Sequence, residues 1–449
     1  MKKSSQGQSP TLVRSLLIAN RGEIAVRIIR SCQEMGIRTV AVYSQADADA
    51  LHVKMADKAV CIGPAASAQS YLNQEALITA AISTRCDAIH PGVGFLSENA
   101  DFAAAVRKAG LVFIGAEPGT IRMLGDKIQA KETARSAGLP LVPGSDGPIS
   151  NVDDAIKVAE TIGTPLIVKA AAGGGGRGMR IIRNSVEIEE NIRIASAEAK
   201  SFFSDGTIFM ERYLESPRHV EIQVLSDGNG EVLYLGERDC SVQKNYQKLL
   251  EESPSTAVSP ELRQRMREDV VRLFHKIKYA GAATVEFLVE GEEHYFMEVN
   301  ARVQVEHPVT ELTTGVDIIR EQILAGSEGR MDISQEDITI NGYALETRVN
   351  ARTPGKVTLF EAPAGPFVRT DTFLYTGCTV SPHYDSMVAK VLIWAPNRKT
   401  GLARMSRALR EIKIEGIKTN IEEQLQILES AQFRSGRFGT DLYGKLFTE

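Results

Sequence analysis

The sequence predicts a protein of mixed α/β and α+β class: an N-terminal doubly wound parallel sheet, a middle region with a glycine-rich hairpin, and a mainly β C-terminal region. Three observations predict this fold. Apolar strands alternate with amphipathic helices from residue 12 to about residue 123, glycines stand between two short apolar strands at residues 165–184, and strand-like segments dominate after residue 340. We expect a helix near residues 400–413 to close the third region.

Length and composition bound the class of protein. With 449 residues, of which 43% are hydrophobic, the chain can bury a large core and is expected to form about three domains. A net charge of −5 gives no basic footprint for nucleic acid. The five cysteines have no CxxC spacing, so we expect neither a disulfide framework nor a zinc site, and a reducing cytoplasm is the simplest location. No stretch of 18 apolar residues occurs, so no membrane association is expected.

The N-terminal region opens with a predicted strand at residues 14–20 and a helix from Glu23 to Met35. Apolar residues at helical spacing give the helix one buried stripe: Ile24, Ile28, Ile29 and Cys32. Asn20 and Glu23 have the spacing of a capping box, so the helix should begin directly after the strand. No GxGxxG fingerprint follows this strand, so dinucleotide binding is not supported.

The middle region opens with a helix after Gly125-Asp126-Lys127 and contains the glycine-rich hairpin. Lys169 lies on its first strand, and the bare N–H groups of its tip could wrap polyphosphate oxygens. It is no Walker A loop, because no GK[ST] follows. A flexible linker is the alternative, although linkers are seldom bracketed by two strands. Lys127 alone is weaker, since a lysine at a helix start is more often solvated.

Residues 286–306 alternate between polar and apolar side chains. In an extended conformation one face would carry the polar residues Glu298, Asn300, Arg302, Gln304 and Glu306. A three-residue turn at residues 291–293 would fold the segment into a hairpin. Its predicted cross-strand pairs are Glu286 with Glu298, Phe287 with Met297, and Val289 with Tyr295.

Two carboxylates directly opposite each other destabilise a hairpin unless a cation lies between them. With Asn300 beside Glu286 and Glu298, the oxygen-only ligand set points to Mg²⁺ or Mn²⁺. An ordinary half-solvated hairpin is the alternative. Arg302 on the same face favours the metal, because a metal beside a guanidinium suits phosphate and oxyanion binding.

Eight ordered motifs resemble one family over nearly the whole chain, the biotin carboxylases of the ATP-grasp superfamily, which form the biotin-carboxylating subunit of acyl-CoA carboxylases. The motifs are IANRGEIAVR (18–27), AIHPGVGFLSENA (88–100), GDK (125–127), VKAAAGGGGRGM (168–179), ERYLESPRHVEIQV (211–224), ERDCSVQKNYQK (237–248), EVNARVQVEHPVTE (298–311) and HYDSM (383–387). The resemblance implies a Rossmann-like domain at 11–123, an ATP-grasp domain at 124–327 whose glycine-rich lid covers about 140–212, and a biotin carboxylase C-terminal domain at 340–446.

The resemblance also implies roles for individual residues. Phosphates and ribose of ATP would be held by Lys127, Lys169, His219, Gly175 and Gly176, and the rest of the nucleotide by Glu211, Arg212, Tyr213, Leu214, Gln243 and Tyr246. Two Mg²⁺ or Mn²⁺ ions would bind Glu286, Glu298 and Asn300. Bicarbonate would be held by Lys248, Arg302, Gln304 and Val305, Glu306 would deprotonate it, and Arg348 would face the ureido oxygen of biotin.

The chemistry agrees with these residue types. Bicarbonate is a poor nucleophile until a carboxylate removes its proton, and phosphoryl transfer then needs metal and cationic neutralisation. The ureido nitrogen of biotin is a very weak acid, so an arginine aimed at the developing oxyanion supplies the stabilisation that the reaction requires.

The sequence departs from the family pattern at four places. Val93 stands where relatives usually have Tyr, Ala172 replaces one glycine of the lid, and Tyr246 replaces a His that contacts nucleotide. The loop after Asn350 is shorter than usual, which surface loops tolerate. We therefore expect intact ATP, metal and bicarbonate machinery and an altered biotin or carrier end.

No Met-Lys-Met biotin attachment segment occurs, so the resemblance implies a separate biotinylated carrier protein or subunit and a carboxyltransferase. The family's dimer contacts correspond to Arg30, Glu34 and Arg369, so a homodimer is expected. Two alternatives stay open at this point: an ATP-grasp ligase that acts on a different acceptor, and a non-catalytic paralogue that regulates a partner.

Overall fold

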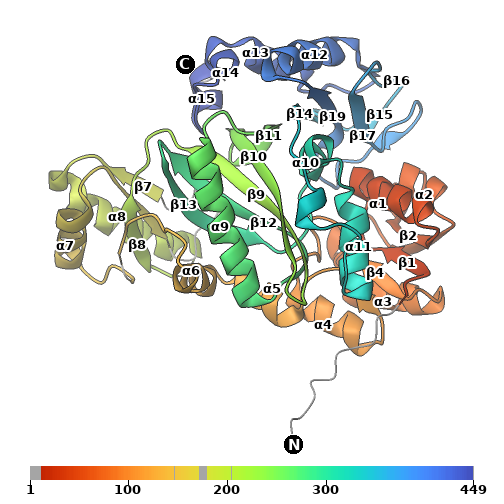
Figure 1. Ribbon diagram of the computed structural model, residues 1–449, viewed down its shortest axis with the longest axis horizontal. Helices are drawn as coiled ribbons and strands as arrows, with labels where there is room; N and C mark the ends of the chain where they lie inside the picture. Colours follow the sequence, from red (N-terminus) through yellow and green to blue (C-terminus); the bar gives the residue numbers. More distant parts are fainter. Residues whose placement is uncertain (1–11, 146, 171–178, 204, 448–449) are drawn as a thin grey trace, which may run out of the picture.

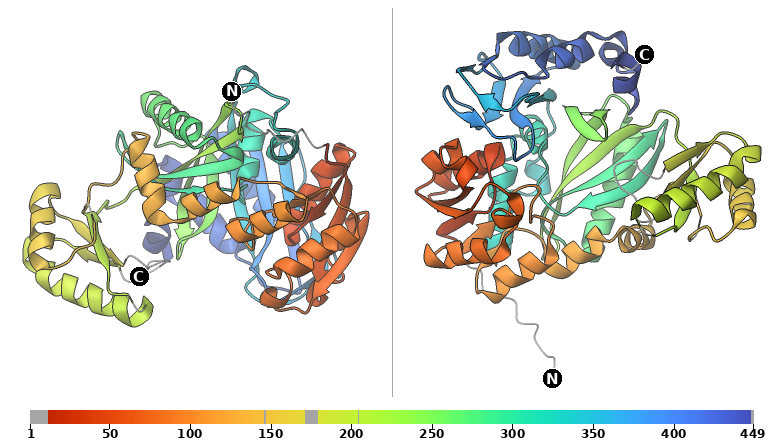
Figure 2. Two further views of the ribbon diagram at one scale, coloured as in Figure 1. Left: turned by 90° about the horizontal axis from the view of Figure 1, so that it is seen from below. Right: turned by 180° about the vertical axis from the view of Figure 1, so that it is seen from behind.

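The computed structural model describes residues 12–145, 147–170, 179–203 and 205–447. Figures 1 and 2 show an N-terminal sheet and a C-terminal region on one side of a large central sheet, with a small lobe at the opposite end. The predicted α/β and α+β class is confirmed.

The N-terminal region is a five-stranded parallel sheet with the order β3-β2-β1-β4-β5. Its elements are β1 (Ser15–Ile18), α1 (Gly22–Glu34), β2 (Arg38–Ser44), α2 (Leu51–Met55), β3 (Lys58–Gly63), α3 (Gln74–Ser83), β4 (Ala88–His90), α4 (Ala100–Lys108) and β5 (Val112–Phe113). The strand order reverses between β1 and β4. In doubly wound sheets, ligands bind at the carboxyl ends of the strands at such a switch point.

The predicted capping box is wrong, although α1 does begin right after β1. Arg21 is the N-cap and makes no side-chain cap hydrogen bond. The Asn20 amide instead donates to the carbonyl oxygens of Pro91 at 2.7 Å and Val93 at 2.8 Å. Glu23 turns away to pair with Lys390. Asn20 therefore ties together the two loops that leave the switch point.

The small lobe holds the strands of the glycine-rich hairpin. Strands β6 (Leu166–Ala170) and β7 (Met179–Ile182) pair antiparallel, as predicted, and β8 (Ile208–Arg212) completes the sheet. The tip, with Gly175 and Gly176, lies outside the described residues. Helices α7 (Val152–Ile162) and α8 (Ile188–Phe203) pack in this lobe, while α5 (Pro118–Gly125) and α6 (Lys127–Ser136) connect it to the N-terminal region.

An eight-stranded sheet with the order β13-β12-β9-β10-β11-β14-β19-β17 forms the centre of the molecule. Its strands are β9 (Arg218–Asp227), β10 (Val232–Lys244), β11 (Gln247–Ser253), β12 (Ala280–Glu290), β13 (Glu293–Asn300), β14 (Tyr343–Asn350), β17 (Val368–Thr372) and β19 (Met387–Ala395). Because β11 pairs with β14, this sheet continues from the middle region into the C-terminal region.

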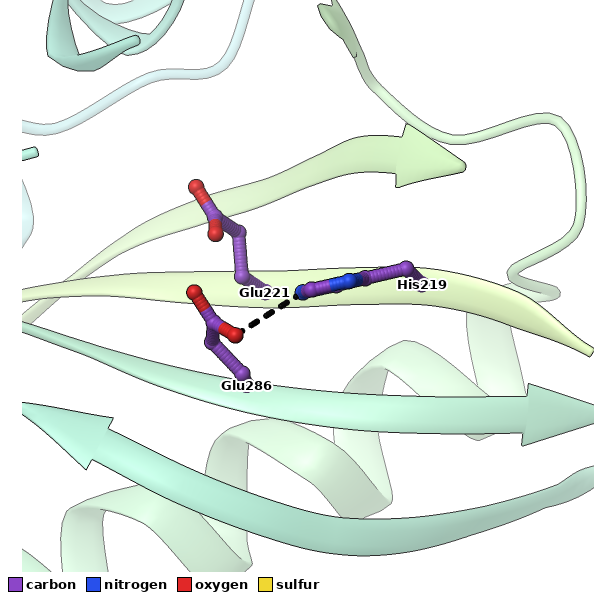
Figure 3. A group of neighbouring side chains, drawn as sticks. All are labelled: His219, Glu221 and Glu286. Atoms are coloured by element: carbon purple, nitrogen blue, oxygen red, sulfur yellow. Dashed lines mark ion pairs between the residues drawn. The ribbon is translucent and has the colours of Figure 1, made fainter. Parts of the chain in front are cut away.

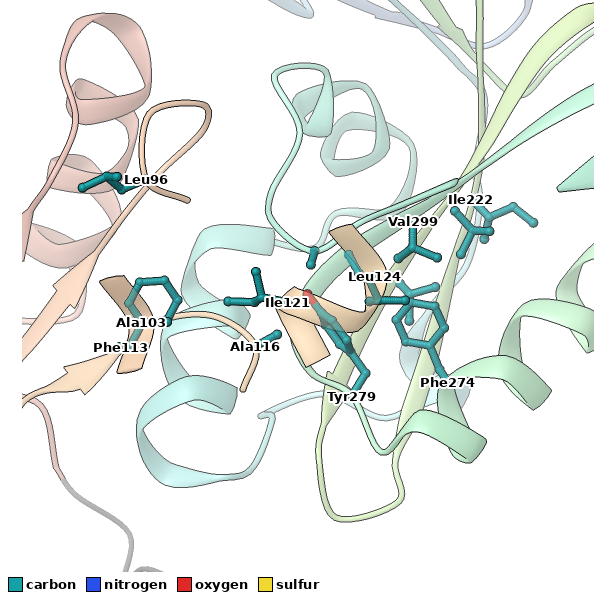
Figure 4. Packing of buried hydrophobic residues seen from close by; sticks show 14 of the residues in the cluster. Leu96, Ala103, Phe113, Ala116, Ile121, Leu124, Ile222, Phe274, Tyr279 and Val299 are labelled. Carbon is teal, nitrogen blue, oxygen red and sulfur yellow. The ribbon is translucent and has the colours of Figure 1, made fainter. Parts of the chain in front are cut away.

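One apolar core joins the central sheet to the N-terminal region. Figure 4 shows Phe113 and Ala116 of the N-terminal region, Leu124 of α5, and Phe274 of α9 (Pro260–Ile277) within the same cluster. The small lobe has a core of its own around Val168 and Met210. The central sheet and the N-terminal region are therefore packed as one body, whereas the lobe is packed separately.

The C-terminal region contains more helix than predicted. The expected helix near 400–413 is α12 (Arg398–Glu411), but it does not close the region, because α13 (Ile421–Glu429), α14 (Ala431–Ser435) and α15 (Leu442–Phe447) follow. Leu425 and Leu428 of α13 are buried against the sheet. The remaining elements are α10 (His307–Thr314), α11 (Ile318–Glu328) and the short strands β15 (Gly355–Lys356), β16 (Leu359–Glu361), β18 (Thr379–Val380) and β20 (Lys413–Glu415).

Among the described residues, no helix is both long enough and apolar enough to cross a membrane.

Candidate functional site

A cavity of about 720 Å³ opens where the N-terminal, central and C-terminal regions meet. From the N-terminal switch point it is lined by Asn20, Arg21, Val93 and Phe95, from the central sheet by His219, Lys248, Glu286, Glu298 and Asn300, from the loop after β13 by Arg302, Gln304 and Val305, and from the C-terminal region by Arg348, Tyr384 and Asp385. Ten of the twenty site residues predicted from the sequence thus line one cavity, whereas Glu306 and those predicted residues of the small lobe that the structure describes are not among its lining residues.

The β12–β13 hairpin places two carboxylates side by side. Glu286 and Glu298 are register partners, as predicted. A bulge then shifts the register, so Phe287 pairs with Phe296 and Val289 with His294, and the predicted pairs Phe287–Met297 and Val289–Tyr295 are wrong. The turn has two residues instead of three, because Glu290 pairs with Glu293. Gly291 has a φ of 62°, the left-handed conformation that such a short turn requires.

The segment after Asn300 does not stay extended, contrary to the prediction. Strand β13 ends at Asn300, and α10 begins at His307. Glu306 is fully buried instead of sharing the face of Glu298. Since the six residues between strand and helix leave the sheet, their backbone must be fixed by side chains.

Arg302 is held on three sides. Its guanidinium donates to Glu98 at 2.8 Å, to the Asn300 side-chain oxygen at 3.0 Å and to the Gln304 side-chain oxygen at 3.0 Å. The second oxygen of Glu98 accepts the Ala301 N–H at 3.0 Å. Glu98 therefore fixes both the backbone and the cation at the cavity wall.

Lys248 is the centre of the buried charges. Its Nζ lies 2.6 Å from Glu221, 2.9 Å from Glu286 and 2.6 Å from Glu306. Burial opposes the ionisation of Glu306, but Lys248 and Arg348 outweigh it and hold the pKa of this carboxyl well below its usual range. Burial likewise opposes the charge of Lys248, yet the three carboxylates raise its pKa well above the usual range. Both groups are charged at neutral pH.

Arg348 bridges two buried carboxylates. It donates to Glu251 at 2.6 Å through Nε and to Glu306 at 2.9 Å through Nη2. Burial raises the pKa of Glu251 to about 7, although Arg348 acts in the opposite direction. Glu306 thus lies between Lys248 and Arg348, with one carboxylate oxygen on each.

His219 is buried beside the metal-type residues. Its Nε2 lies 3.1 Å from Glu286, and its Nδ1 lies 2.8 Å from the Gln243 amide. Burial lowers the pKa of His219, but Glu286 outweighs that effect and raises it overall. Figure 3 shows His219, Glu221 and Glu286 close together. Their ligand atoms lie within 4.8 Å of one another, but Glu221 is fully buried and already pairs with both Arg238 and Lys248, so this trio is a poor metal site.

Glu286, Glu298 and Asn300 fit a divalent cation better. The Asn300 side-chain N–H donates to Glu286 at 3.0 Å, and both carboxylates line the cavity. Partial desolvation, together with the charge of Glu286, raises the pKa of Glu298. A divalent ion would relieve that repulsion, and carboxylate and amide oxygens are its preferred ligands.

Of the predicted nucleotide residues that the structure describes, only His219 and Tyr246 are among the lining residues of this cavity, and several others lie in or next to the small lobe. Glu211 of β8 accepts Lys169 at 2.5 Å and Lys131 at 2.6 Å. Arg212 pairs with Glu290 at 2.7 Å. Lys127 is the first residue of α6, and Tyr213 and Leu214 directly follow β8. Tyr246 lies in the β10–β11 turn. Lys169 of the glycine-rich hairpin thus contacts Glu211, another of the predicted nucleotide residues.

Tyr246 lines the cavity with 63% of its surface exposed. Its φ is 64°, and that of Asn245 is 51°. Non-glycine residues seldom adopt this conformation, and such outliers gather at functional sites.

Several lining residues were not singled out from the sequence. Arg21 donates to both oxygens of Asp47, at 2.7 and 2.8 Å, and lies 4.1 Å from the ring of Tyr384. Arg21 and Tyr384 both belong to motifs quoted above, as does Glu98. The motifs were the available signal, but spacing alone does not show that distant loops meet.

Three family models match the chain in order. Residues 12–121 match the biotin carboxylase N-terminal domain, residues 126–332 the carbamoyl-phosphate synthase L chain ATP-binding domain, and residues 345–444 the biotin carboxylase C-terminal domain. The middle match places the chain among proteins built around this ATP-binding domain. Taken with the two flanking matches and the relatives below, it shows that the chain belongs to the biotin carboxylase family.

Two curated relatives are similar over nearly their whole length. The biotin carboxylase of Haemophilus influenzae is 49% identical over 440 residues, covering 96% of this chain and 98% of that protein. Biotin carboxylase 1 of Bacillus subtilis is 49% identical over 439 residues, with the same coverage.

Solved structures agree with this assignment. The chain is similar to a biotin carboxylase–beta-gamma-ATP complex from Campylobacter jejuni, with a TM-score of 0.90, 44% identity and coverage of 96% of this chain and 99% of that one. It is also similar to the biotin carboxylase domain of a thermophilic 2-oxoglutarate carboxylase bound to bicarbonate (TM-score 0.92, 42% identity, coverage 96% and 98%). A third is the dimer of that domain from Hydrogenobacter thermophilus, with MgADP, ADP and bicarbonate (TM-score 0.87, 43% identity, coverage 96% and 97%).

Proposed function

We propose that this chain carboxylates biotin in an ATP-dependent reaction that uses bicarbonate. The observation that carries the proposal is the buried pair of cations around Glu306, which open onto the same cavity as Arg302 and the Glu286–Glu298 carboxylates. A base, oxyanion-binding cations and metal-type ligands are the groups that this reaction needs in one place.

ATP would lie between the small lobe and the central sheet. Lys127 and Lys169 would contact its phosphates, together with the hairpin tip at Gly175 and Gly176. The segment 211–214 would contact the rest of the nucleotide, along with His219, Gln243 and Tyr246. The Lys169–Glu211 ion pair supports this placement, because it joins two residues of the proposed binding surface.

Two Mg²⁺ or Mn²⁺ ions would be held by Glu286, Glu298 and Asn300, where they would neutralise phosphate charge. The fit rests on the opposed carboxylates described above. Burial, together with the charge of Glu286, raises the pKa of Glu298, and a divalent ion would favour its ionised form.

Bicarbonate would bind against Arg302, Lys248, Gln304 and the N–H of Val305. Glu306 would take its proton, so that a bicarbonate oxygen attacks the γ-phosphorus and ADP leaves, forming carboxyphosphate. The low pKa of Glu306 keeps it ionised and ready to accept a proton. Carboxyphosphate would then break into CO₂ and inorganic phosphate in the cavity, the phosphate would take the ureido N–H proton of biotin, and the ureido nitrogen would attack CO₂.

Arg348 would stabilise the ureido oxygen of biotin when its nitrogen loses a proton. Its guanidinium lines the cavity, although two carboxylates already hold it. Two of the four departures from the family pattern, Val93 and the shortened loop after Asn350, fall at the proposed biotin end. Val93 lines that end, and the shortened loop is tied down by Arg352, whose N–H donates to the Lys418 carbonyl at 2.6 Å.

The biotin would reach the cavity on a separate carrier protein, and a carboxyltransferase would take the carboxyl group onward. We also propose a cytoplasmic homodimer in which Arg30, Glu34 and Arg369 lie at the contact, and a division into domains at 11–123, 124–327 and 340–446. Arg30 and Glu34 are exposed on α1, while Arg369 already pairs with Glu311 at 2.7 Å.

The test is ATP hydrolysis with Mg²⁺ and bicarbonate, measured with and without biotin. Stimulation by both bicarbonate and biotin supports the proposal. Turnover that needs bicarbonate but ignores biotin would point to another acceptor, and no turnover at any biotin concentration would contradict the proposal.

A further inference from the structure

Lys390 is a lysine without any solvent exposure, on strand β19 behind the cavity wall. Lysine is almost never fully buried unless it is paired, because removing an ammonium group from water is costly. A buried lysine next to a proposed active site therefore needs an account of what it holds.

The Nζ of Lys390 contacts three separate parts of the molecule. It donates to the Val305 carbonyl oxygen at 2.8 Å, lies 3.0 Å from Glu23 of α1, and lies 3.9 Å from Asp371 of β17. The N-terminal region, the loop before α10 and the C-terminal sheet thus meet at one ammonium group.

The neighbours of Lys390 on the sheet are also charged. Arg348 of β14 is its register partner, so the two cations lie side by side on one face. Glu346, two residues earlier on β14, faces the same way and is fully buried. The positive charge of Lys390 is compensated by acidic groups on three elements: Glu23, Glu346 and Asp371.

The Val305 carbonyl belongs to the segment that has left the sheet. Strand β13 has ended and α10 has not begun, so no ladder hydrogen bond can hold this peptide. The preceding carbonyl, of Gln304, accepts a hydrogen bond from His307 Nδ1 at 2.8 Å. Two successive carbonyls, of Gln304 and Val305, are therefore fixed by buried side chains.

We propose that Lys390 is a positioning residue for bicarbonate. By fixing the Val305 carbonyl, it sets the direction of the Gln304–Glu306 backbone and so aims Gln304, the Val305 N–H and the Glu306 carboxylate at one point. This inference rests on the proposed function. Lys390 is a positioning residue and not a catalytic one, because its side chain is fully buried and does not line the cavity.

The expected effect falls on bicarbonate and spares ATP. A displacement of about 1 Å in a positioning group can cost about 100-fold in rate. We expect Lys390→Met to raise the KM for bicarbonate by at least about tenfold, while the KM for ATP changes less than about twofold, because the nucleotide residues belong to other elements.

Lys390→Met alone also leaves Glu23 without its cation, and the protein is expected to be less stable. The double variant Lys390→Met with Glu23→Gln removes the charge and its nearest partner together. Arg369 still pairs with Asp371 at 2.7 Å, and burial raises the pKa of Glu346 so that its neutral form is favoured. If Lys390 only supports the fold, this double variant recovers both the melting temperature and the KM for bicarbonate. If Lys390 positions the loop, the melting temperature recovers and the KM stays high, because nothing donates to the Val305 carbonyl.

A matched control is the exposed ion pair between Lys413 and Glu361, whose charged atoms lie 2.6 Å apart. Lys413→Met with Glu361→Gln removes the same two charges far from the loop and should match the wild type. A wild-type enzyme that does not respond to bicarbonate would overturn the proposed function itself. If the wild type responds to bicarbonate and the double variant of Lys390 and Glu23 has a normal KM for bicarbonate, only the role of Lys390 is overturned.

Discussion

The cavity wall and the small lobe both carry charged residues that the proposed reaction would use, but the two regions bury these charges to different extents. In the wall, Lys248 is 12% exposed and its partner Glu306 is fully buried. In the lobe and beside it, Lys169 is 37% exposed and Lys131 is 44% exposed, although both pair with Glu211. The wall belongs to the central eight-stranded sheet, whereas the lobe is a three-stranded sheet with a separate core.

This difference in burial shows which charged groups the fold holds in place and which it leaves free to exchange partners. A charge in a low-dielectric wall acts strongly and needs no reorganisation during the reaction, but it must be paired in order to be buried. A half-exposed lysine contributes little to stability, and its pairing with Glu211 can be exchanged for a ligand. Under the proposed function, the wall would thus be set in advance for bicarbonate, and the lobe would keep Lys169 available for phosphate.

The largest effect is expected at the metal-type carboxylates of the wall. Glu298→Gln should lower ATP turnover by at least about 1,000-fold, because one neutral amide replaces a charge that a divalent ion needs. ADP release at saturating Mg²⁺ measures it. Glu293→Gln, at the start of the same strand, is the control and should keep turnover within about twofold of the wild type. Substantial turnover by Glu298→Gln would show that the carboxylate pair does not belong to the site.

The contrast in stability comes next. Lys248→Met leaves three buried carboxylates without a shared cation and should cost about 3–5 kcal/mol in the free energy of unfolding. Lys169→Met breaks a half-exposed pair and should cost less than about 1 kcal/mol. Urea denaturation measures both. Equal losses for the two variants would mean that wall and lobe hold their charges in the same way.

Substitution of Arg348 should distinguish the carboxylation of biotin from the bicarbonate-dependent hydrolysis of ATP. Arg348→Ala should lower biotin carboxylation by about 100-fold, and bicarbonate-dependent ATP hydrolysis far less, because an oxyanion donor to biotin is lost while Lys248 still holds Glu306. The two rates are measured on one preparation. Arg352→Ala, on the short loop nearby, serves as the control, and an equal fall in both rates would assign Arg348 to bicarbonate instead.

The smallest effect is a dependence of stability on pH. Burial raises the pKa of Glu251 to about 7, so its neutral form is favoured in the folded protein. The stability that this group contributes is complete below its unfolded pKa and is lost as pH rises through about 7, with a slope of at most about 1.4 kcal/mol per pH unit for one proton. Glu251→Gln cannot titrate, so its stability should fall less between pH 5 and pH 8, as thermal melts across that range would show; an unchanged slope would place the titration elsewhere.

Local patterns predicted much of the fold and of the site. The period of apolar residues gave the helix at α1 to within one residue at each end, and the glycine-flanking strands pair as expected. The Glu286–Glu298 pair was also predicted, but it arises because a two-residue turn and a bulge together give the register that a three-residue turn would give.

What failed depends on contacts between distant segments. Asn20 forms no capping box because the loop at Pro91 and Val93 offers its amide two carbonyls. The segment after Asn300 keeps an alternating pattern, yet it leaves the sheet, because burying Glu306 between Lys248 and Arg348 outweighs local strand preference. No spacing rule could show that these cations, from β11 and β14, converge there.

The most direct test of the account is transfer of labelled carbon from bicarbonate to biotin in the presence of ATP and Mg²⁺. The account predicts labelled carboxybiotin in an amount that rises with ADP, and loss of both products in Glu306→Gln. ADP formation without label on biotin, or undiminished carboxybiotin from Glu306→Gln, would contradict the claim that the buried wall around Glu306 performs the chemistry.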